Sequence, residues 1–202
     1  MQSPGECRRV IFIDELFARM HATRARMWAR RGIYPRLPSW DHHGKWTVYG
    51  AVDVRTGEFQ SVVAAEWNNE MLRGLLEQIV SEWGEEGLLI VWDNGRIHHA
   101  KAVQTWFEAH PGVRLWCLPP YCSELDPVEM IWRQLRRAVT DNHIFTAMDE
   151  LKAVLEDWLQ RASQQPRSVF AMMGIDPTAP EIRLQMDRPH RDCPNGLRLI
   201  AV

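Results

Sequence analysis

Two short apolar runs, each followed at once by an aspartate, constrain the fold of this chain more than any other feature. Residues 10–13 (VIFI) precede Asp14, and residues 88–92 (LLIVW) precede Asp93. Continuous runs of β-branched and other apolar residues of this length predict buried strands. Asp is common at strand-to-turn junctions, but a carboxylate after a buried strand is costly unless it is paired, hydrogen-bonded or bound to metal. Both aspartates are therefore candidate site residues at the C-terminal edges of strands, where ligands of open α/β sheets gather.

The remaining patterns predict an α/β architecture. Residues 45–54 and 58–65 are strand-like runs joined by the short turn at 55–57, which suggests a hairpin, and residues 113–118 form a further strand. Helices are expected at residues 68–83, with Asn68 or Asn69 as N-cap, and at 98–109, 127–139 and 147–160. The order is three antiparallel strands and then helices alternating with further strands. It predicts a mixed sheet flanked by helices.

A chain of 202 residues suits one domain with a substantial core. We expect this domain at residues 1–175. Residues 176–202 contain four prolines without clear periodicity and are interpreted as an irregular C-terminal tail. The four cysteines match neither a zinc site nor a disulfide framework. We see no signal peptide or membrane span, so we expect a cytoplasmic protein without a membrane partner.

The net charge of -2 hides an uneven distribution of charge. Residues 16–40 contain six Arg and no acid, whereas residues 66–87 contain six Glu and one Arg. The basic segment is a candidate phosphate-binding surface, although a solvated Arg-rich helix or loop has the same composition. The arginines that we single out for DNA contact there are Arg24, Arg26, Arg30 and Arg31.

A third acid lies at the start of a predicted helix. Asp126 is placed to cap this helix, with Pro127 at its first position and Glu129 at its third. Helical spacing puts Glu129 on a face with three arginines, and an apolar stripe lies on another face. The first face suits phosphate and metal binding, but it is also typical of an ordinary ion-paired helix. These arginines are Arg133, Arg136 and Arg137, and the stripe consists of Val128, Ile131, Trp132, Leu135 and Val139.

Together, Asp14, Asp93 and Glu129 offer hard oxygen ligands from three separate elements. Mg²⁺ prefers a few carboxylates, with water and substrate phosphate completing its coordination. Two such ions about 3.5–4 Å apart activate the attacking oxygen and stabilise the leaving oxygen in phosphodiester chemistry. The three acids therefore indicate a two-metal site, provided that they converge in space.

Several motifs resemble a known family over residues 10–162. They are FIDE at 12–15, WARRG at 28–32, VWDNGRIH at 91–98 and, most specifically, LPPYCSELDPVE at 118–129, followed by Trp132. The interval between Asp93 and Glu129 is 35 residues. In this order and spacing, the motifs resemble the DDE transposases of bacterial insertion sequences related to the mariner superfamily, specifically the insertion-sequence six-thirty group.

The resemblance implies a ribonuclease-H-like fold with Asp14, Asp93 and Glu129 as the catalytic triad and as ligands of Mg²⁺, for which Mn²⁺ substitutes. It implies metal-dependent hydrolysis at transposon ends, followed by attack of the freed 3′-hydroxyl on target DNA. Asn94 and His98 occupy matching motif positions and are given supporting roles, although His98 is equally compatible with a helix-start residue whose hydrogen bond is satisfied. The implied partner is DNA, in the cytoplasm at the bacterial nucleoid.

The chain departs from the family pattern at three points. The family block usually has Pro at Ser123 and Asn at Asp126, so Asp126 adds a negative charge beside the expected metals. Family members also carry helix-turn-helix modules before the first strand, whereas nine residues precede Val10 here. We expect specific end recognition to be lost or supplied by a separately encoded helix-turn-helix chain, and a homodimer is the other expected assembly.

Two other functions stay open at this point. The first is a truncated or inactive remnant that binds DNA without catalysis, which the short N-terminus and irregular tail favour. The second is a ribonuclease-H-like nuclease of branched or hybrid nucleic acid, which does not explain the proline-rich block before Glu129. The three intact acids favour retained transposase chemistry.

Overall fold

A five-stranded sheet with the strand order β3-β2-β1-β4-β5 forms the centre of the protein. The structure is a computed structural model, and it describes residues 8–21, 23–34, 36, 44–66, 68–93, 95, 100–119, 125–176, 182–186 and 197–201. The first three strands are antiparallel, and the last two run parallel to β1, so the predicted mixed sheet is confirmed. The strands are β1 (Arg9–Arg19), β2 (Lys45–Asp53), β3 (Phe59–Ala64), β4 (Leu88–Trp92) and β5 (Val113–Cys117).

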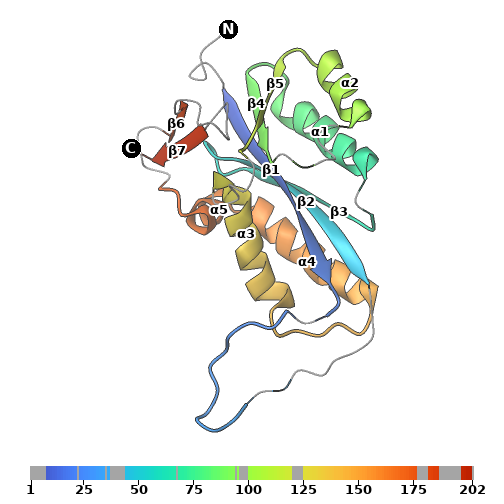
Figure 1. The fold of residues 1–202 in the computed structure, drawn as a ribbon, viewed down its shortest axis with the longest axis vertical. Helices are drawn as coiled ribbons and strands as arrows, with labels where there is room; N and C mark the ends of the chain where they lie inside the picture. Colours follow the sequence, from blue (N-terminus) through green and yellow to red (C-terminus); the bar gives the residue numbers. More distant parts are fainter. Residues whose placement is uncertain are drawn as a thin grey trace.

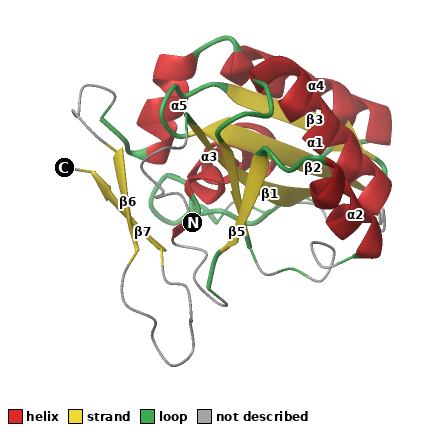
Figure 2. Ribbon diagram, turned by 90° about the horizontal axis from the view of Figure 1, so that it is seen from above, coloured by secondary structure: helices red, strands yellow, loops and turns green. Residues whose placement is uncertain are grey.

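Helices cover both faces of this sheet (Figures 1 and 2). β1 alternates between two apolar cores: Ile11 and Ile13 face the first, and Phe12 and Leu16 face the second. The first core lies beneath α1 (Asn69–Trp83) and α2 (Lys101–Ala109). The second lies beneath α3 (Pro127–Leu135), α4 (Met148–Ser163) and α5 (Pro166–Met173). Because strand side chains alternate between faces, Asp14 belongs to the face that α3 covers.

Most predicted helices are present, with some shifted ends. Asn68 caps α1 by accepting a hydrogen bond from the backbone N–H of Met71 at 2.9 Å, as one of the two expected caps. The helix expected at residues 98–109 is described from Lys101, and the helix expected at 127–139 changes from α3 into a π-helical turn, η4 (Arg136–Thr140). Within the described ranges, every helix is too short or too polar to cross a bilayer.

The expected end of the first strand is wrong. β1 continues through Asp14 to Arg19, because β2 pairs with it as far as Lys45. Leu16 and Ala18 remain buried on the face of α3, so the apolar alternation persists beyond the short continuous run. Asp14 therefore lies in the interior of a long strand.

The C-terminal segment contains more regular structure than its composition indicated. β6 (Ile182–Met186) and β7 (Leu197–Ala201) form an antiparallel pair in a separate two-stranded sheet. The sequence IRLQM at 182–186 alternates apolar and polar residues, which is the pattern of a short strand. The division of the chain at residue 175 stays a prediction.

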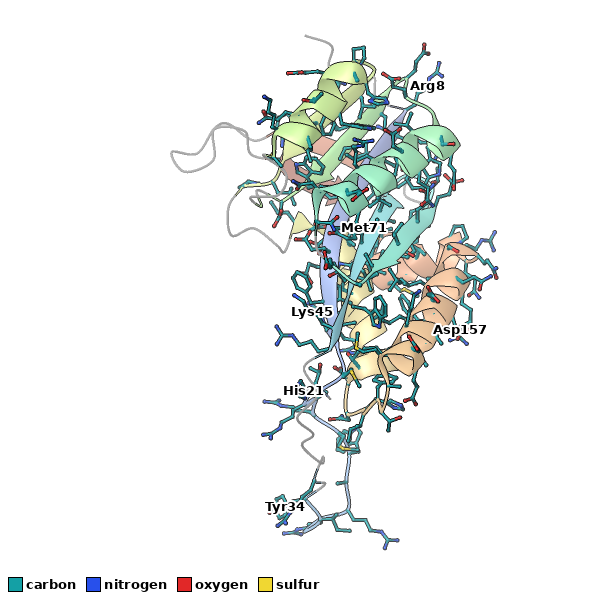
Figure 3. All side chains as sticks on the ribbon, turned by 90° about the vertical axis from the view of Figure 1, so that its right-hand side faces the viewer. Arg8, His21, Tyr34, Lys45, Met71 and Asp157 are labelled. Atoms are coloured by element: carbon teal, nitrogen blue, oxygen red, sulfur yellow. The ribbon has the colours of Figure 1, made fainter. Side chains whose placement is uncertain are left out.

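The described residues 23–34, which we call the arm, extend away from the sheet between β1 and β2. Figure 3 shows Tyr34 at the far end of this excursion, well beyond His21 and Lys45. The described residues of the arm form no helix, so of the two structures expected for this Arg-rich segment, helix or loop, the loop is observed there. The base of the arm is attached to the end of η4, because Thr23 donates a backbone hydrogen bond to Thr140 and accepts one from Asn142.

Candidate active site

Two aspartates meet where the parallel pairing of β1 with β4 ends. The last paired residues are Ile13 and Trp92, and the next residues are Asp14 and Asp93. Neighbouring strands lie about 4.8 Å apart, so the backbones of the two aspartates are adjacent. β1 continues past this point whereas β4 stops, so Asp14 is mostly covered and Asp93 is exposed.

The first turn of α3 brings Glu129 to the same place. Asp126 caps the helix by accepting a hydrogen bond from the backbone N–H of Val128 at 2.9 Å, and Pro127 occupies the first turn, as the sequence predicted. The apolar stripe of α3 is buried against the sheet. The helix therefore enters the site at its N-terminal end, with Glu129 half-exposed and close enough for its charge to act on Asp14.

The electrostatics of the site show that its carboxylates are crowded. Burial, followed by the charges of Glu15, Glu129 and Asp93, raises the pKa of Asp14 to about 7. Burial and then the charge of Asp14 raise the pKa of Asp126 well above its usual range. The structure thus brings the three predicted acids together and adds Asp126, whose extra charge the comparison with the family motif had already indicated.

These carboxylates have the chemistry of a divalent-cation site. Deprotonated carboxylates this close repel one another in a poorly solvated setting, and a hard cation would relieve that repulsion through the oxygen ligands it prefers. Among the described side chains, however, no three acids, histidines or cysteines are already arranged around a common metal position. The donor set of Asp14, Asp93 and Glu129 nevertheless fits Mg²⁺.

Trp132 contacts the most buried of the three acids. Its indole N–H donates a hydrogen bond to Oδ2 of Asp14 at 3.0 Å. Sequence reasoning placed Trp132 on the apolar stripe and missed this bond. The signal available was a residue with a single N–H donor, one helical turn after Glu129, on the face directed at the strand that carries Asp14.

Basic side chains lie beside the acids. Arg136 donates a hydrogen bond to Oε2 of Glu129 at 3.4 Å, so these two residues of the predicted helix face form an ion pair. Arg136 also lines a cavity of about 330 Å³ with Arg19, His21 and Thr140, between β1, the base of the arm and η4. The other arginines that we predicted to bind DNA are exposed on the arm or along α3 and η4: Arg24, Arg26, Arg30, Arg31, Arg133 and Arg137.

Two predicted supporting residues, Asn94 and His98, lie outside the described residues. In the adjoining described part, the backbone N–H of Gly95 donates a hydrogen bond to Oδ1 of Asp93 at 2.8 Å. This bond fixes the turn after β4 and orients the Asp93 carboxylate.

Comparison with known proteins gives a family match over most of the chain. A family model described as DDE superfamily endonuclease matches residues 9–152. A curated relative, an insertion element IS630 uncharacterized 39 kDa protein from Shigella sonnei, is 23% identical over 158 residues, which are 78% of this chain and 46% of the relative. The chain therefore spans about half the length of that relative.

Solved structures share the fold at low sequence identity. A mariner Mos1 paired end complex with Mg has a TM-score of 0.62 and 15% identity, over 82% of this chain and 52% of that one. The catalytic domain of Mos1 mariner transposase has a TM-score of 0.53 and 16% identity, over 82% and 78% of the two chains. A simian T-cell lymphotropic virus intasome has a TM-score of 0.52 and 14% identity, over 74% and 47%. The expected ribonuclease-H-like fold is confirmed.

The raised pKa of Asp14 predicts how stability depends on pH in the absence of divalent cations. The folded state holds this proton up to about pH 7, whereas the unfolded chain releases it near pH 4. Stability should therefore fall as pH rises from 4 to 7. Asp14→Asn should raise the free energy of unfolding at pH 8 by up to about 4 kcal/mol, because about three pKa units at about 1.4 kcal/mol per unit separate the two states, and at pH 5 by about 1–2 kcal/mol.

Urea unfolding in EDTA at pH 5 and pH 8 measures this difference. Asn retains an oxygen that accepts the Trp132 hydrogen bond, so the variant removes charge and little else. Asp149→Asn, an exposed acid of α4, is the control and should change neither value by more than about 0.5 kcal/mol. An Asp14→Asn protein no more stable than the wild type at pH 8 would contradict the assignment of electrostatic strain to this residue.

Proposed function

The chain belongs to the DDE superfamily endonucleases, and from this premise we propose that it is the catalytic domain of a DNA transposase, which cleaves phosphodiester bonds at element ends and joins them to target DNA. The observation that carries this proposal is the meeting of Asp14, Asp93 and Glu129, which come from two parallel strands and a helix. The similar Mos1 structures include a pre-cleavage transpososome and a strand transfer complex, which supports the same chemistry.

Asp14, Asp93 and Glu129 would hold Mg²⁺, and Mn²⁺ would substitute for it. Their crowding favours this role, because the fold retains a repulsion among acids that bound cations would offset. Two of the similar Mos1 complexes are complexes with Mn and with Mg, which supports both choices of cation. When bound, the ions supply positive charge at the attacking and leaving oxygens. The chain itself contributes the orientation of the acids through β1, β4 and α3.

DNA is the proposed substrate and partner, and the basic surface would bind its phosphates. Arg136 pairs with Glu129 and lines the cavity at the base of the arm, and the arm carries four further exposed arginines. Contacts with phosphate are largely independent of sequence and position the duplex over the site. Asn94 and His98 are proposed to orient the site or the scissile phosphate, and Arg133 and Arg137 are proposed to extend the DNA contact.

Recognition of particular element ends would require additional protein. Because the chain spans about half of its curated relative, we propose that a helix-turn-helix region, on a separate chain or elsewhere in the full protein, supplies this recognition. A homodimer is the proposed assembly for pairing two ends. We propose that the protein works in the cytoplasm, at the nucleoid. The intact acid cluster favours catalysis over a remnant that only binds DNA.

Cleavage of end-sequence DNA tests the catalytic proposal. Asp93→Asn should reduce Mg²⁺- or Mn²⁺-dependent nicking by at least about 10³-fold, since loss of a charged ligand removes stabilisation that the transition state requires. Asn can still accept the hydrogen bond from Gly95, so the fold and its thermal midpoint should not change. Asp149→Asn is the matched control and should nick like the wild type. Equal nicking by Asp93→Asn and the wild type would remove Asp93 from the catalytic assignment.

The salt dependence of DNA binding tests the role of the arm. Replacing Arg24, Arg26, Arg30 and Arg31 with Gln should weaken duplex binding and reduce the slope of log K against log salt by about 0.9 for each phosphate that the arm neutralises in the wild type. Fluorescence anisotropy at several salt concentrations measures this slope. Arg73→Gln, on the acidic helix α1, removes a charge elsewhere and should leave the slope unchanged. An unchanged slope in the arm variant would exclude these arginines from the DNA interface.

A further inference from the structure

A glycine lies directly opposite the most buried acid of the site. Gly50, in the interior of β2, pairs with Asp14 of β1. Directly opposed residues of an antiparallel pair point to the same face of the sheet, so a side chain on Gly50 would lie beside the carboxylate. A glycine inside a strand weakens the strand and often marks a site where another group approaches closely.

The group that approaches Gly50 is the indole of Trp132. A Cβ atom on Gly50 would lie 2.5 Å from Cη2 and 2.7 Å from Cζ2 of this ring, distances that packed atoms do not reach. Phe59 is the next neighbour, with Cε2 at 3.1 Å from that position, and its ring meets the indole edge-on with centroids 6.2 Å apart. The absent side chain of Gly50 therefore makes the space that the six-membered ring of Trp132 fills.

The same edge of the indole reaches the acid. With its six-membered ring seated over Gly50, Trp132 is fully buried and directs its N–H at Oδ2 of Asp14, 3.0 Å away. Close packing of the buried indole on Gly50 and Phe59 holds the N–H at one position. Since Trp132 lies one helical turn after Glu129, α3 carries both an acid of the site and the group that holds another.

We propose that Trp132 is a positioning residue for Asp14, and that Gly50 is required because it admits the indole. This inference rests on the proposed function, in which Asp14 is a metal ligand. Partners that orient a metal ligand are often nearly as important as the ligand itself. With Oδ2 held by the indole, the carboxylate has a defined orientation before any cation arrives.

The type of donor matters for this role. An Arg or Lys in the place of Trp132 would hold the carboxylate more strongly, but its positive charge would also compete with a divalent cation. The indole N–H is a donor that carries no charge. It therefore orients Asp14 while leaving the negative charge of the site for the metal.

Removal of the N–H alone tests the proposal. Trp132→Phe keeps an aromatic ring in the core and loses the donor. Trp106→Phe is the matched control, because Trp106 is equally buried and its indole donates to Oε1 of Glu77 at 2.8 Å, between α2 and α1 in the other core. We expect Trp132→Phe to weaken Mn²⁺ binding, measured by calorimetry, and to slow Mg²⁺-dependent nicking, each by about 10- to 100-fold. Trp106→Phe should lower the thermal midpoint by a similar amount, but it should change Mn²⁺ affinity and nicking rate by no more than about twofold.

A second set of variants tests the role of Gly50 without removing the N–H donor. Gly50→Ala should also weaken Mn²⁺ binding, because the new methyl group displaces the indole from Asp14. In the Trp132→Phe background, Gly50→Ala should weaken Mn²⁺ binding much less, because the atoms that the new methyl group would contact belong to the indole. Gly74→Ala, where an added Cβ meets nothing within 4 Å, is the control. Additive effects of Gly50→Ala and Trp132→Phe would overturn the proposal, and so would wild-type Mn²⁺ affinity and nicking in Trp132→Phe.

A measurement without metal separates this inference from the proposed function. In ¹⁵N-labelled protein, Asp14→Asn should shift the indole N–H resonance of Trp132 and leave that of Trp106 in place. An unshifted Trp132 resonance would overturn the hydrogen bond itself. A wild-type protein that neither binds Mn²⁺ nor nicks DNA overturns the proposed function. If the wild type binds Mn²⁺ and nicks DNA, and Trp132→Phe equals it in both, the positioning role alone is overturned.

Discussion

Parallel pairing between β1 and β4 ends at Ile13 and Trp92, and each strand continues with an aspartate. This register places Asp14 beside Asp93 through backbone hydrogen bonds, without any side chain having to bring them together. β1 then runs on for five residues with β2 on one side only, so the site opens at the edge that β4 leaves uncovered. The exposure of Asp93 and the cavity along the last residues of β1 both follow from this end of the pairing.

The packing of α3 on β1 gives the site its electrostatic character. The helix buries its apolar stripe against the face to which Asp14 points. The burial of Asp14 itself is the largest cause of its raised pKa. The same helix brings Glu129 and Asp126, which increase the repulsion. A folded chain that tolerates such a cluster gives up stability, a cost that is common where function requires a strained arrangement, and the proposed cations would offset the repulsion.

Charge is separated along the chain in a way that the net value conceals. η4 carries Arg136, which pairs with Glu129, and the arm carries further arginines, whereas α1, on the opposite face of the sheet, carries three of the six Glu of residues 66–87. Arg136 belongs to both regions, because it pairs with Glu129 and lines the cavity at the base of the arm.

The sequence by itself determined the alternation of strands and helices and the cap of α3, and it singled out each of the three acids as a candidate, because each of these signals depends on residues near one another in the chain. Apolar runs, helical spacing and the Asp-Pro start of a helix are local signals. Tertiary structure decided the features that depend on distant partners. Pairing with β2 extends β1 past Asp14, and the pairing of 182–186 with 197–201 forms strands in a segment expected to be irregular. The packing of α3 directs Trp132 toward Asp14. The need for glycine at position 50 is apparent only in the folded protein, where Trp132, far along the chain, packs over it. A local pattern can specify a buried ring, but only the assembled sheet and helix decide which atoms that ring meets.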